Sequence, residues 1–309
     1  MDVSVIIINY NTLELTKNTI NSVIEKTKGL EYEIILVDNA STDGSIDFFE
    51  KEYKNKIVFI KNNENLGFGK ANNKGVEIAK GKYVFLLNSD TLLINNAIKI
   101  LFDFMEKNNN CGACGGNLYS ENLKPDHSTR FELPYMTLKT EIDLYLNFPK
   151  MLLLKLLKKR NDFNYSNFPK KVGYIVGADL MLKKDIFLSV GGFDSDFFMY
   201  HEEVELLYRI VKKGYDIFSI PEAKIIHLGG KSGKFKEKTA RMVLEGKYKY
   251  FYKCFGLKEC KYLYYIIQTS NFLKTILRPQ KQHKDMLKIN KEEYNKFLLN
   301  YRTLRRNNL

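Results

Sequence analysis

Cysteine is scarce in this chain of 309 residues, which contains only four. Four cysteines cannot build the dense disulfide framework of a small secreted domain, so the composition favours a reducing, cytoplasmic setting. Cys111 and Cys114 form a single C-x-x-C pair, and Cys254 and Cys260 lie far away with a different spacing. A structural zinc site usually needs a second closely spaced pair. We therefore expect buried structural thiols rather than metal ligands.

Long apolar runs and N-terminal targeting signals are also missing. No stretch reaches the roughly 18 apolar residues that would indicate a membrane-spanning helix. The first residues, Met1 to Ser4, lead directly into a strand-like run without a basic region or a cleavage site, which predicts that there is no signal peptide.

Two glycine-rich phosphate-binding motifs are absent. No G-x-G-x-x-G follows the first apolar run, which argues against a nicotinamide or flavin enzyme. No G-x-x-x-x-G-K-[ST] occurs, which argues against a P-loop NTPase. Without a glycine cradle, a divalent cation must neutralise more of the charge on any bound phosphates.

Positive charge is concentrated at one end of the chain. The net charge is +13, yet residues 231–309 hold 20 lysines and arginines against six acidic residues, which leaves the remainder at −1. A nearly neutral main domain offers nucleic acid no electrostatic attraction, so we expect no nucleic-acid partner. The basic tail and residues 142–160 both combine apolar faces with lysine and arginine, which suits the surface of an anionic membrane. A helix that covers a cleft, a helical pair packed on the main domain, or a homodimer element are the alternatives.

Strand-like and helix-like segments alternate over the first 119 residues. This alternation predicts an α/β fold made of βαβ units around a mostly parallel sheet. Strands are expected at residues 3–8, 33–37, 57–60, 83–87, 113–119, 173–182 and 217–227. Helices are expected at residues 15–24, 45–53, 70–79, 97–107, 142–159, 184–190 and 202–213, and again beyond residue 233.

Polar side chains follow three of the predicted strands at the point where each strand ends. In a doubly wound sheet these ends converge on one crevice, where ligands bind. Asp38 is suited to accept hydrogen bonds from a base or ribose, Tyr10 to stack on a base, and Asp90 to hold a divalent cation against a diphosphate. Capping of the helices that follow is the alternative, since these residue types dominate turns and N-caps. The three clusters are Asn9-Tyr10-Asn11, Asp38-Asn39 and Asn88-Ser89-Asp90.

A second group of candidate residues lies later in the chain. Glu202 and Glu203 follow an aromatic run at the start of a predicted helix, where the helix dipole favours negative charge. Crowding of two carboxylates raises the pKa of one of them, which suits a general base. His227 ends an apolar run beside a glycine turn, where a neutral imidazole can bind a metal. An ordinary acidic first turn and a structural histidine are the alternatives.

Taken in order, these blocks resemble family 2 glycosyltransferases, particularly the rhamnosyltransferase-like branch that builds bacterial surface polysaccharides. The resemblance covers about three quarters of the chain, from residue 3 to residue 233. Single blocks are weakly specific, but eight blocks in the right order are strongly specific. They lie at residues 3–11, 37–45, 65–73, 87–91, 177–178, 191–194, 197–203 and 227–230.

The resemblance implies a GT-A fold and the transfer of a sugar, with inversion, from a nucleoside-diphosphate donor to a saccharide or lipid-linked saccharide acceptor. It implies a divalent cation, manganese or magnesium, held by Asp90 and His227. Glu203 occupies the position of the catalytic base, with Glu202 beside it, and Asp38 binds the nucleoside. The other donor-binding candidates are Asn9, Tyr10, Asn11, Asn65, Gly67, Asn72, Asn88 and Ser89.

Three features depart from the family's pattern. The triplet that ends at Asp90 keeps only the last acid of a D-x-D motif, so fewer carboxylates are available for the cation. Glu203 is one methylene longer than the aspartate that is usual there. Asp179 is unusual beside the preceding Gly-Ala pair and is a candidate contact for the acceptor or the sugar. Arg130 is a further candidate for phosphate or acceptor.

The sequence therefore predicts a GT-A domain over residues 1–233, with a nucleotide-sugar half at 1–119 and an acceptor half at 120–233. A basic helical extension follows at 234–309. We expect the enzyme to work at the inner face of the cell membrane in surface polysaccharide synthesis. A sugar-activating nucleotidyltransferase is the alternative enzyme, although no glycine-rich basic loop for a triphosphate follows the first strand. A binding module whose tail holds nucleic acid is a third, weaker hypothesis.

Overall fold

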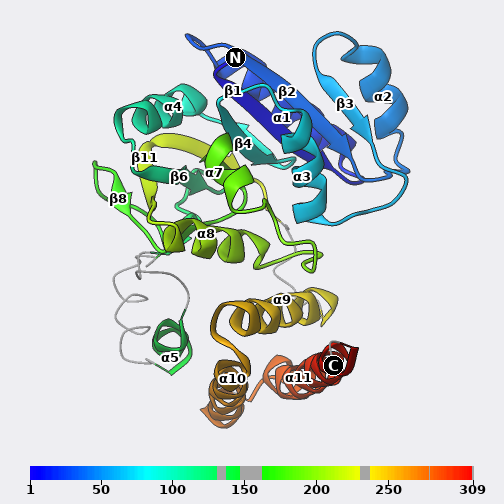
Figure 1. Cartoon of the computed structure of the whole chain (residues 1–309), viewed down its shortest axis with the longest axis vertical. Helices are drawn as coiled ribbons and strands as arrows, with labels where there is room; N and C mark the ends of the chain where they lie inside the picture. The colour runs from blue at the N-terminus through cyan, green and yellow to red at the C-terminus, as the bar shows by residue number, and fades with distance from the viewer. Residues whose placement is uncertain (131–136, 147–161, 230–236, 278, 308–309) are drawn as a thin grey trace. The chain divides into compact units, whose positions relative to one another are not determined.

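The computed structural model describes residues 1–130, 137–146, 162–229, 237–277 and 279–307. The chain divides into two compact units (Figure 1). The first contains Met1–Tyr135, Arg160–Phe198 and Glu203–Lys231, and the second contains Met136–Lys159, Met199–Glu202 and Ser232–Leu309.

One large sheet dominates the first unit. Its strand order is β3-β2-β1-β4-β10-β6-β11-β5, and β8 pairs with β11 beside this series. A separate two-stranded sheet joins β7 and β9. The strands are β1 (Val3–Asn9), β2 (Tyr32–Asp38), β3 (Val58–Lys61), β4 (Tyr83–Asn88), β5 (Thr91–Leu93), β6 (Cys111–Tyr119), β7 (Thr129–Arg130), β8 (Lys170–Lys171), β9 (Tyr174–Ile175), β10 (Asp179–Lys183) and β11 (Asp216–His227). The helices of this unit are α1 (Leu13–Lys26), α2 (Ser45–Glu52), α3 (Phe68–Ile78), α4 (Ala97–Lys107) and α7 (Lys184–Ser189), together with α8 (Glu202–Lys212) from its second residue onward.

The first half of the sheet is parallel. β1 lies between β2 and β4, with Asn9 opposite Asp38 and Ile8 opposite Asn88. Because these strands run in the same direction, their carboxyl ends lie at one edge of the sheet. This register brings together the three polar clusters that the sequence places after strands.

The second half of the sheet is mixed. β10 runs antiparallel to both β4 and β6, whereas β11 is parallel to β6 and antiparallel to β5. In the pairing of β5 with β11, His227 lies opposite Thr91. The end of β11 is therefore placed next to Asp90, although the two segments are far apart in the sequence.

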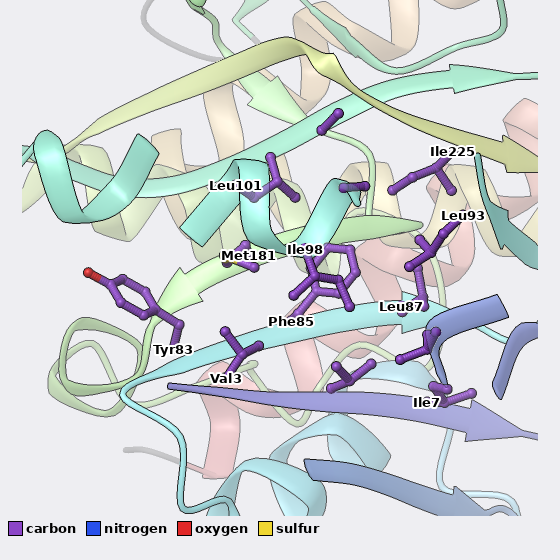
Figure 2. Close-up of a cluster of buried hydrophobic side chains, with 14 of the residues drawn as sticks. Val3, Ile7, Tyr83, Phe85, Leu87, Leu93, Ile98, Leu101, Met181 and Ile225 are labelled. Atoms are coloured by element: carbon purple, nitrogen blue, oxygen red, sulfur yellow. The ribbon is translucent and has the colours of Figure 1, made fainter. Parts of the chain in front are cut away.

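The hydrophobic core lies between the sheet and the helices α1, α2 and α4. Figure 2 shows Phe85 from the sheet beside Ile98 of α4, and both side chains are fully buried. Replacing a buried phenylalanine such as Phe85 with alanine typically costs about 3–5 kcal/mol. On the opposite face α3 approaches closely, because Gly75 has no side chain and a Cβ there would lie 2.6 Å from the Cγ2 of Ile6.

The second unit is helical, and ion pairs join its helices. It contains α5 (Leu138–Leu146), α9 (Glu237–Phe255), α10 (Leu257–Leu277) and α11 (Lys281–Asn307). Lys247 of α9 forms a 2.7 Å ion pair with Glu141 of α5, and both side chains are almost completely buried. Arg241 bridges α9 to α11 by binding Glu292 at 2.6 Å and Glu293 at 2.9 Å. Removing one partner of a buried pair such as Lys247–Glu141 leaves an uncompensated charge, which costs about 3–5 kcal/mol.

The predicted α/β class with a helical C-terminal region is confirmed. The expected strand at 173–182 is divided into β9 and β10, and β7 lies where no strand was expected. The expected helix at 142–159 overlaps α5, and its remainder, from residue 147, lies outside the described residues. α5 belongs to the second unit, so the observed division differs from a single boundary at residue 233.

Two further expectations concern thiols and membrane spans. Cys111 and Cys114 are both free and fully buried in β6, as the lone C-x-x-C pair predicts. Burial raises the pKa of the Cys114 thiol well above its ordinary value. Among the helices that the structure describes, none is long and apolar enough to cross a bilayer.

Candidate active site at the carboxyl edge of the sheet

The Asn9 and Asp38 side chains form a buried polar hub where β1 and β2 end. Both residues are completely buried. The Nδ2 of Asn9 donates to the Oδ2 of Asp38 at 2.6 Å and to the Oγ of Ser41 at 3.0 Å. The Oδ1 of Asp38 accepts a hydrogen bond from the backbone N–H of Ser41 at 2.8 Å. By accepting these hydrogen bonds, the Asp38 carboxylate fixes the loop that follows β2 at the carboxyl edge of the sheet.

Tyr10 and Asn11 form the rim above this hub. The Tyr10 side chain is 48% exposed, so its ring is accessible to a planar ligand. Asn11 has a left-handed backbone with φ of 54°, a conformation that asparagine tolerates better than most residues. Its Oδ1 accepts a hydrogen bond from the backbone N–H of Thr42 at 2.7 Å. The loops after β1 and β2 are thus tied together beneath an exposed aromatic ring.

The segment from Asn65 to Asn72 turns beside this rim. The Oδ1 of Asn65 accepts a hydrogen bond from the Gly67 N–H at 2.9 Å, and Asn39 donates to the Gly67 carbonyl at 3.1 Å. Asn72 is almost fully buried and donates to the Phe68 carbonyl at 3.0 Å. These three predicted donor-binding residues therefore also hold the local backbone in place.

Asp90 and His227 meet at the end of β4. The Oδ1 of Asp90 lies 3.4 Å from the Nε2 of His227, and the side chains are 25% and 21% exposed. The backbone N–H of Leu228 donates to the Asp90 carbonyl at 2.8 Å, which closes this corner. Burial alone would lower the pKa of His227, but the hydrogen bond and charge of Asp90, helped by Asp126, raise that pKa above its ordinary value.

This corner fits a divalent cation. Adjacent ligands of an octahedral magnesium ion lie about 3.0 Å apart, because each bond is about 2.1 Å long. The 3.4 Å separation of Asp90 and His227 is therefore close to that of two neighbouring ligands. Within the described ranges no group of three histidine, cysteine or acidic side chains gathers around one point. Diphosphate oxygens and water would have to complete the coordination shell.

Asn88 and Ser89 lie just before this acid and are partly buried. The backbone N–H of Asn88 donates to the Ala178 carbonyl at 3.0 Å, which ties the end of β4 to the residue before β10. The Oγ of Ser89 accepts a 3.2 Å hydrogen bond from the Thr12 hydroxyl. The triplet is thus held from two sides before Asp90 presents its carboxylate.

The two candidate base residues differ in exposure. Glu202 is 4% exposed, whereas the next residue, Glu203, is partly exposed. A Cβ placed on Gly177 would lie 3.6 Å from the Cβ of Glu203 and 3.5 Å from the ring of Phe68. Glu203 therefore lies beside the start of α3, the helix that carries the predicted donor-binding residue Asn72. Helix α8, which starts at Glu202, follows two residues with left-handed backbones, Tyr200 and His201, whose φ values are 72° and 70°.

Three residues that help to build this site were not singled out by the sequence. Arg209 pairs with Glu205 at 2.6 Å and donates to the Gly192 carbonyl at 2.7 Å, which anchors α8 to the Gly-Gly turn. The Nδ2 of Asn73 donates to the Phe193 carbonyl at 2.8 Å, and its Oδ1 accepts a hydrogen bond from the Phe193 N–H at 2.9 Å. Asp126 adds negative charge near His227. Arg209 follows Glu205 by four residues, a helical pair that the sequence does show; the other two carry no local signal.

Asp179 and Arg130 lie at the start of β10 and in β7. Asp179 is completely buried, and its Oδ2 accepts a hydrogen bond from the Gly116 N–H at 2.7 Å. Burial raises the pKa of its carboxyl group well above the ordinary value, against the effect of that hydrogen bond. The backbone of Arg130 pairs with Tyr174, and its side chain lies outside the described part of the chain. A contact of either residue with sugar or acceptor stays a prediction.

Comparison with known proteins identifies the family. Residues 4–188 match the family model described as glycosyl transferase family 2. Because this match covers more than half of the chain, the protein belongs to that family. The rhamnosyltransferase-like branch is a finer assignment that the match does not address.

Several curated relatives have named activities, among them two glucosyltransferases. A poly(ribitol-phosphate) beta-glucosyltransferase of Bacillus spizizenii is 33% identical over 112 residues, which cover 35% of this chain and 18% of that protein. A UDP-Glc:alpha-D-GlcNAc-diphosphoundecaprenol beta-1,3-glucosyltransferase of Escherichia coli is 36% identical over 104 residues, which cover 34% of this chain and 41% of that protein. The chain thus spans less than half the length of these relatives.

A solved structure supports the fold. The chain is similar to the crystal structure of GalNAc-T7 with UDP, GalNAc and Mn²⁺, with a TM-score of 0.60. The sequences are 17% identical, and the match covers 95% of this chain and 54% of that one. At this level of identity the likeness shows the GT-A-like fold alone.

Proposed function

We propose that this protein is an inverting, metal-dependent glycosyltransferase that moves a sugar from a nucleoside diphosphate to a saccharide or lipid-linked saccharide. The observation that carries the proposal is the Asp90–His227 pair, whose 3.4 Å separation suits a cation at the carboxyl edge of the sheet. The sequence blocks favour a rhamnose-like sugar or another hexose. The named activities of the relatives include transfer of glucose, N-acetylglucosamine and galactose, which favours a hexose.

The donor would lie across the carboxyl ends of β1, β2 and β4. Tyr10 offers an exposed ring for the base, and the hub of Asn9 and Asp38 fixes the loops that would surround the nucleoside. Asp90 and His227 would hold a manganese or magnesium ion, which when bound neutralises charge on the departing diphosphate. A carboxylate, together with water and phosphate oxygens, suits magnesium and manganese alike.

Glu203 would act as the general base. Its partly exposed carboxylate can accept the proton of the acceptor hydroxyl, whereas Glu202 is almost fully buried. As that proton leaves, the acceptor oxygen forms a bond to the anomeric carbon and the bond to the diphosphate oxygen breaks. A single displacement of this kind inverts the anomeric configuration, and nucleoside diphosphate is released.

The proposed acceptor brings the enzyme to the inner face of an anionic membrane. Four side chains recur on one face of α10 and are 47–61% exposed: Tyr262, Tyr265, Phe272 and Ile276. We call this set the α10 stripe. Three lysines of α10 accompany it, and the combination suits the surface of an anionic bilayer. The alternative for this stripe is a homodimer interface.

The proposal is tested by the Asp90→Asn variant. Binding of a panel of nucleoside diphosphates and their sugars is measured by calorimetry with manganese, with magnesium and with a chelator. Wild type should bind at least one donor only when a cation is present, and Asp90→Asn should lose that binding. Asp47→Asn, a change of the same kind on an exposed helix, should behave as wild type. If no donor binds or is hydrolysed under any condition, the proposal is wrong.

A further inference from the structure

A cavity of about 480 Å³ lies in the first unit. None of the residues proposed to bind the donor or the cation, or to act as the base, lines it. It is bounded by α4, β6, β11 and the segment that precedes β8. The residues that matter most for its chemistry are Asn95, Asn117, Tyr119, Phe163, Asn164 and Tyr165. Its volume is within the range of small-ligand sites.

Aromatic rings form one side of this cavity. The ring centroids of Tyr119 and Phe163 are 5.4 Å apart at an angle of 78°, and those of Phe163 and Tyr165 are 4.8 Å apart. Tyr119 and Phe163 are largely buried and support Tyr165, whose side chain is 46% exposed. A supported, accessible ring of this kind offers a flat apolar surface to the C–H face of a pyranose.

An unpaired buried acceptor lies among these rings. Asn117 is 2% exposed, and its Nδ2 donates to the Asn164 carbonyl at 2.9 Å, which fixes the orientation of its amide. Its Oδ1 is buried and receives no hydrogen bond from any described residue. A buried acceptor without a donor costs free energy, so a ligand hydroxyl that supplies the hydrogen bond would be favoured.

The cavity wall is held in place before any ligand arrives. The Oδ1 of Asn164 accepts hydrogen bonds from the N–H and the hydroxyl of Ser166, and its Nδ2 donates to the Ser219 carbonyl at 3.3 Å. The pairing of β11 with β6 shifts register between Ser219 and Lys224. This irregularity lies where Pro221 and Glu222 line the cavity, so the sheet itself makes room for it.

We propose that this cavity binds a sugar unit of the acceptor glycan, at a distance from the hydroxyl that reacts. An aromatic platform together with amide groups is the chemistry that recognises a neutral saccharide, since hydroxyls need donors and acceptors and the ring needs an apolar face. Tyr119 pairs with Ile226, the residue before His227, so the cavity follows the same two strands toward the cation corner. The proposal rests on the glycosyltransferase function and adds a second saccharide subsite to it.

Saccharide binding to the full chain tests this subsite without turnover. Saturation-transfer NMR is recorded with cellobiose, chitobiose and lactose as probes, in the Asp90→Asn background, so that a failed donor site does not affect the result. At least one probe should bind, and Tyr165→Ala should weaken that binding at least tenfold. Phe168→Ala removes an exposed ring from the same segment that does not line the cavity, and it should leave binding unchanged.

A second variant addresses the buried acceptor. Asn117→Leu keeps the side chain's approximate volume and removes the Oδ1, so a folded variant should also lose saccharide binding. If no probe binds, or if Tyr165→Ala and a folded Asn117→Leu both bind like their parent, the subsite does not exist. Equal losses in Tyr165→Ala and Phe168→Ala would also overturn it, because the effect would then belong to the segment and not to the cavity.

With an active enzyme and an identified acceptor, the subsite also predicts a kinetic split. Tyr165→Ala should raise KM for an acceptor of several sugars, whereas kcat and the KM for a monosaccharide acceptor should not change. The rate of donor hydrolysis without acceptor should be the same in the wild type and in Tyr165→Ala.

Discussion

Two adjacent glutamates at the start of α8 have different surroundings. Glu202 is almost fully buried in the structure, whereas Glu203 is partly exposed and lies beside Gly177. A base that takes a proton from an acceptor hydroxyl must be reachable by that acceptor. Accessibility therefore favours the second glutamate, which is the one that the family pattern also places in this role.

Replacing Glu203 with glutamine should remove turnover and keep donor binding. The amide cannot accept the hydroxyl proton, so we expect kcat to fall by about 10²- to 10⁴-fold. Glu203→Asp, which restores the residue usual in the family, should keep more activity than Glu203→Gln. Initial rates with saturating donor, together with calorimetric donor binding, check this. Wild-type turnover in Glu203→Gln would show that the base lies elsewhere.

Asp179 should make the protein less stable as the pH rises. Burial raises the pKa of its carboxyl group in the folded state above the value in the unfolded chain. The stability that it contributes is then fully present below the unfolded pKa and is lost as the pH rises through the folded pKa. Asp179→Asn keeps an acceptor for the Gly116 N–H and removes this titration.

Urea unfolding of both proteins between pH 4 and about pH 9 measures this difference. Relative to Asp179→Asn, the wild-type protein should lose free energy of unfolding with increasing pH. Parallel pH profiles for the two proteins would contradict the assignment.

At the scale of elements, Gly67 holds the turn before α3 against the Phe198 backbone. Its φ is 79°, and a Cβ at this position would overlap the carbonyl oxygen of Phe198. The Phe68 N–H donates to that same carbonyl at 3.0 Å. The donor-side turn and the segment leading to α8 are therefore joined at a point where only glycine fits.

Gly67→Ala should destabilise the protein more than Gly191→Ala. Both glycines have a positive φ, which costs an alanine about 1–2 kcal/mol, but the ψ of −174° at Gly67 is one that essentially only glycine adopts, whereas nothing lies within 4 Å of a Cβ on Gly191. The additional overlap at Gly67 should cost about 1–3 kcal/mol more. Equilibrium urea unfolding at fixed pH gives the two values. Equal losses in the two variants would mean that the turn moves away from Phe198 freely.

The elements differ in how well the sequence predicts them. β1, β2 and β4 were predictable because each contains at least four consecutive apolar residues, and their parallel direction follows from the helices between them. β5 was not predictable, because a strand of three residues is too short to show a hydrophobic alternation. The reversed direction of β10 was also not predictable, because a strand buried on both faces looks the same in either direction. α5 joins the C-terminal helices through Glu141 and Lys247, which are 106 positions apart, and no local pattern shows such a pairing.

The residues of the candidate site also divide into those that a local sequence pattern predicts and those that depend on the folded chain. The clusters at Asn9, Asp38 and Asp90 were found because strand ends converge. His227 was connected to Asp90 through family resemblance, and the pairing of β5 with β11 supplies the physical contact. Asp126 was missed because it lies in a loop with no repeating pattern, and its effect on His227 depends on the folded chain.

At the scale of the whole molecule, the exposed α10 stripe should control binding to anionic vesicles. Changing Tyr262, Tyr265 and Phe272 together to serine removes most of its exposed apolar surface without changing net charge. We expect flotation with phosphatidylglycerol-containing vesicles to fall at least tenfold. Leu123→Ser, Ile78→Ser and Val58→Ser, combined on the first unit, provide a control of matched number.

Two measurements decide between a membrane and a second copy of the chain as the occupant of this stripe. Light scattering of the wild type and the triple variant reports any dimer. Unchanged vesicle binding by the triple variant would refute the membrane role, and conversion of a dimer to a monomer would assign the stripe to self-association.

The pairing of His227 opposite Thr91 also determines the order in which the parts of the candidate site form during folding. Asn9 and Asp38 can meet once the first two strands have formed, but Asp90 gains its partner only after β11 has docked against β5. Contacts between distant parts of a chain form late, because a long loop must close first. A partly synthesised chain would therefore present the Asn9–Asp38 hub without the Asp90–His227 pair, which is the proposed cation site. Cation binding would thus report that the first unit has finished folding.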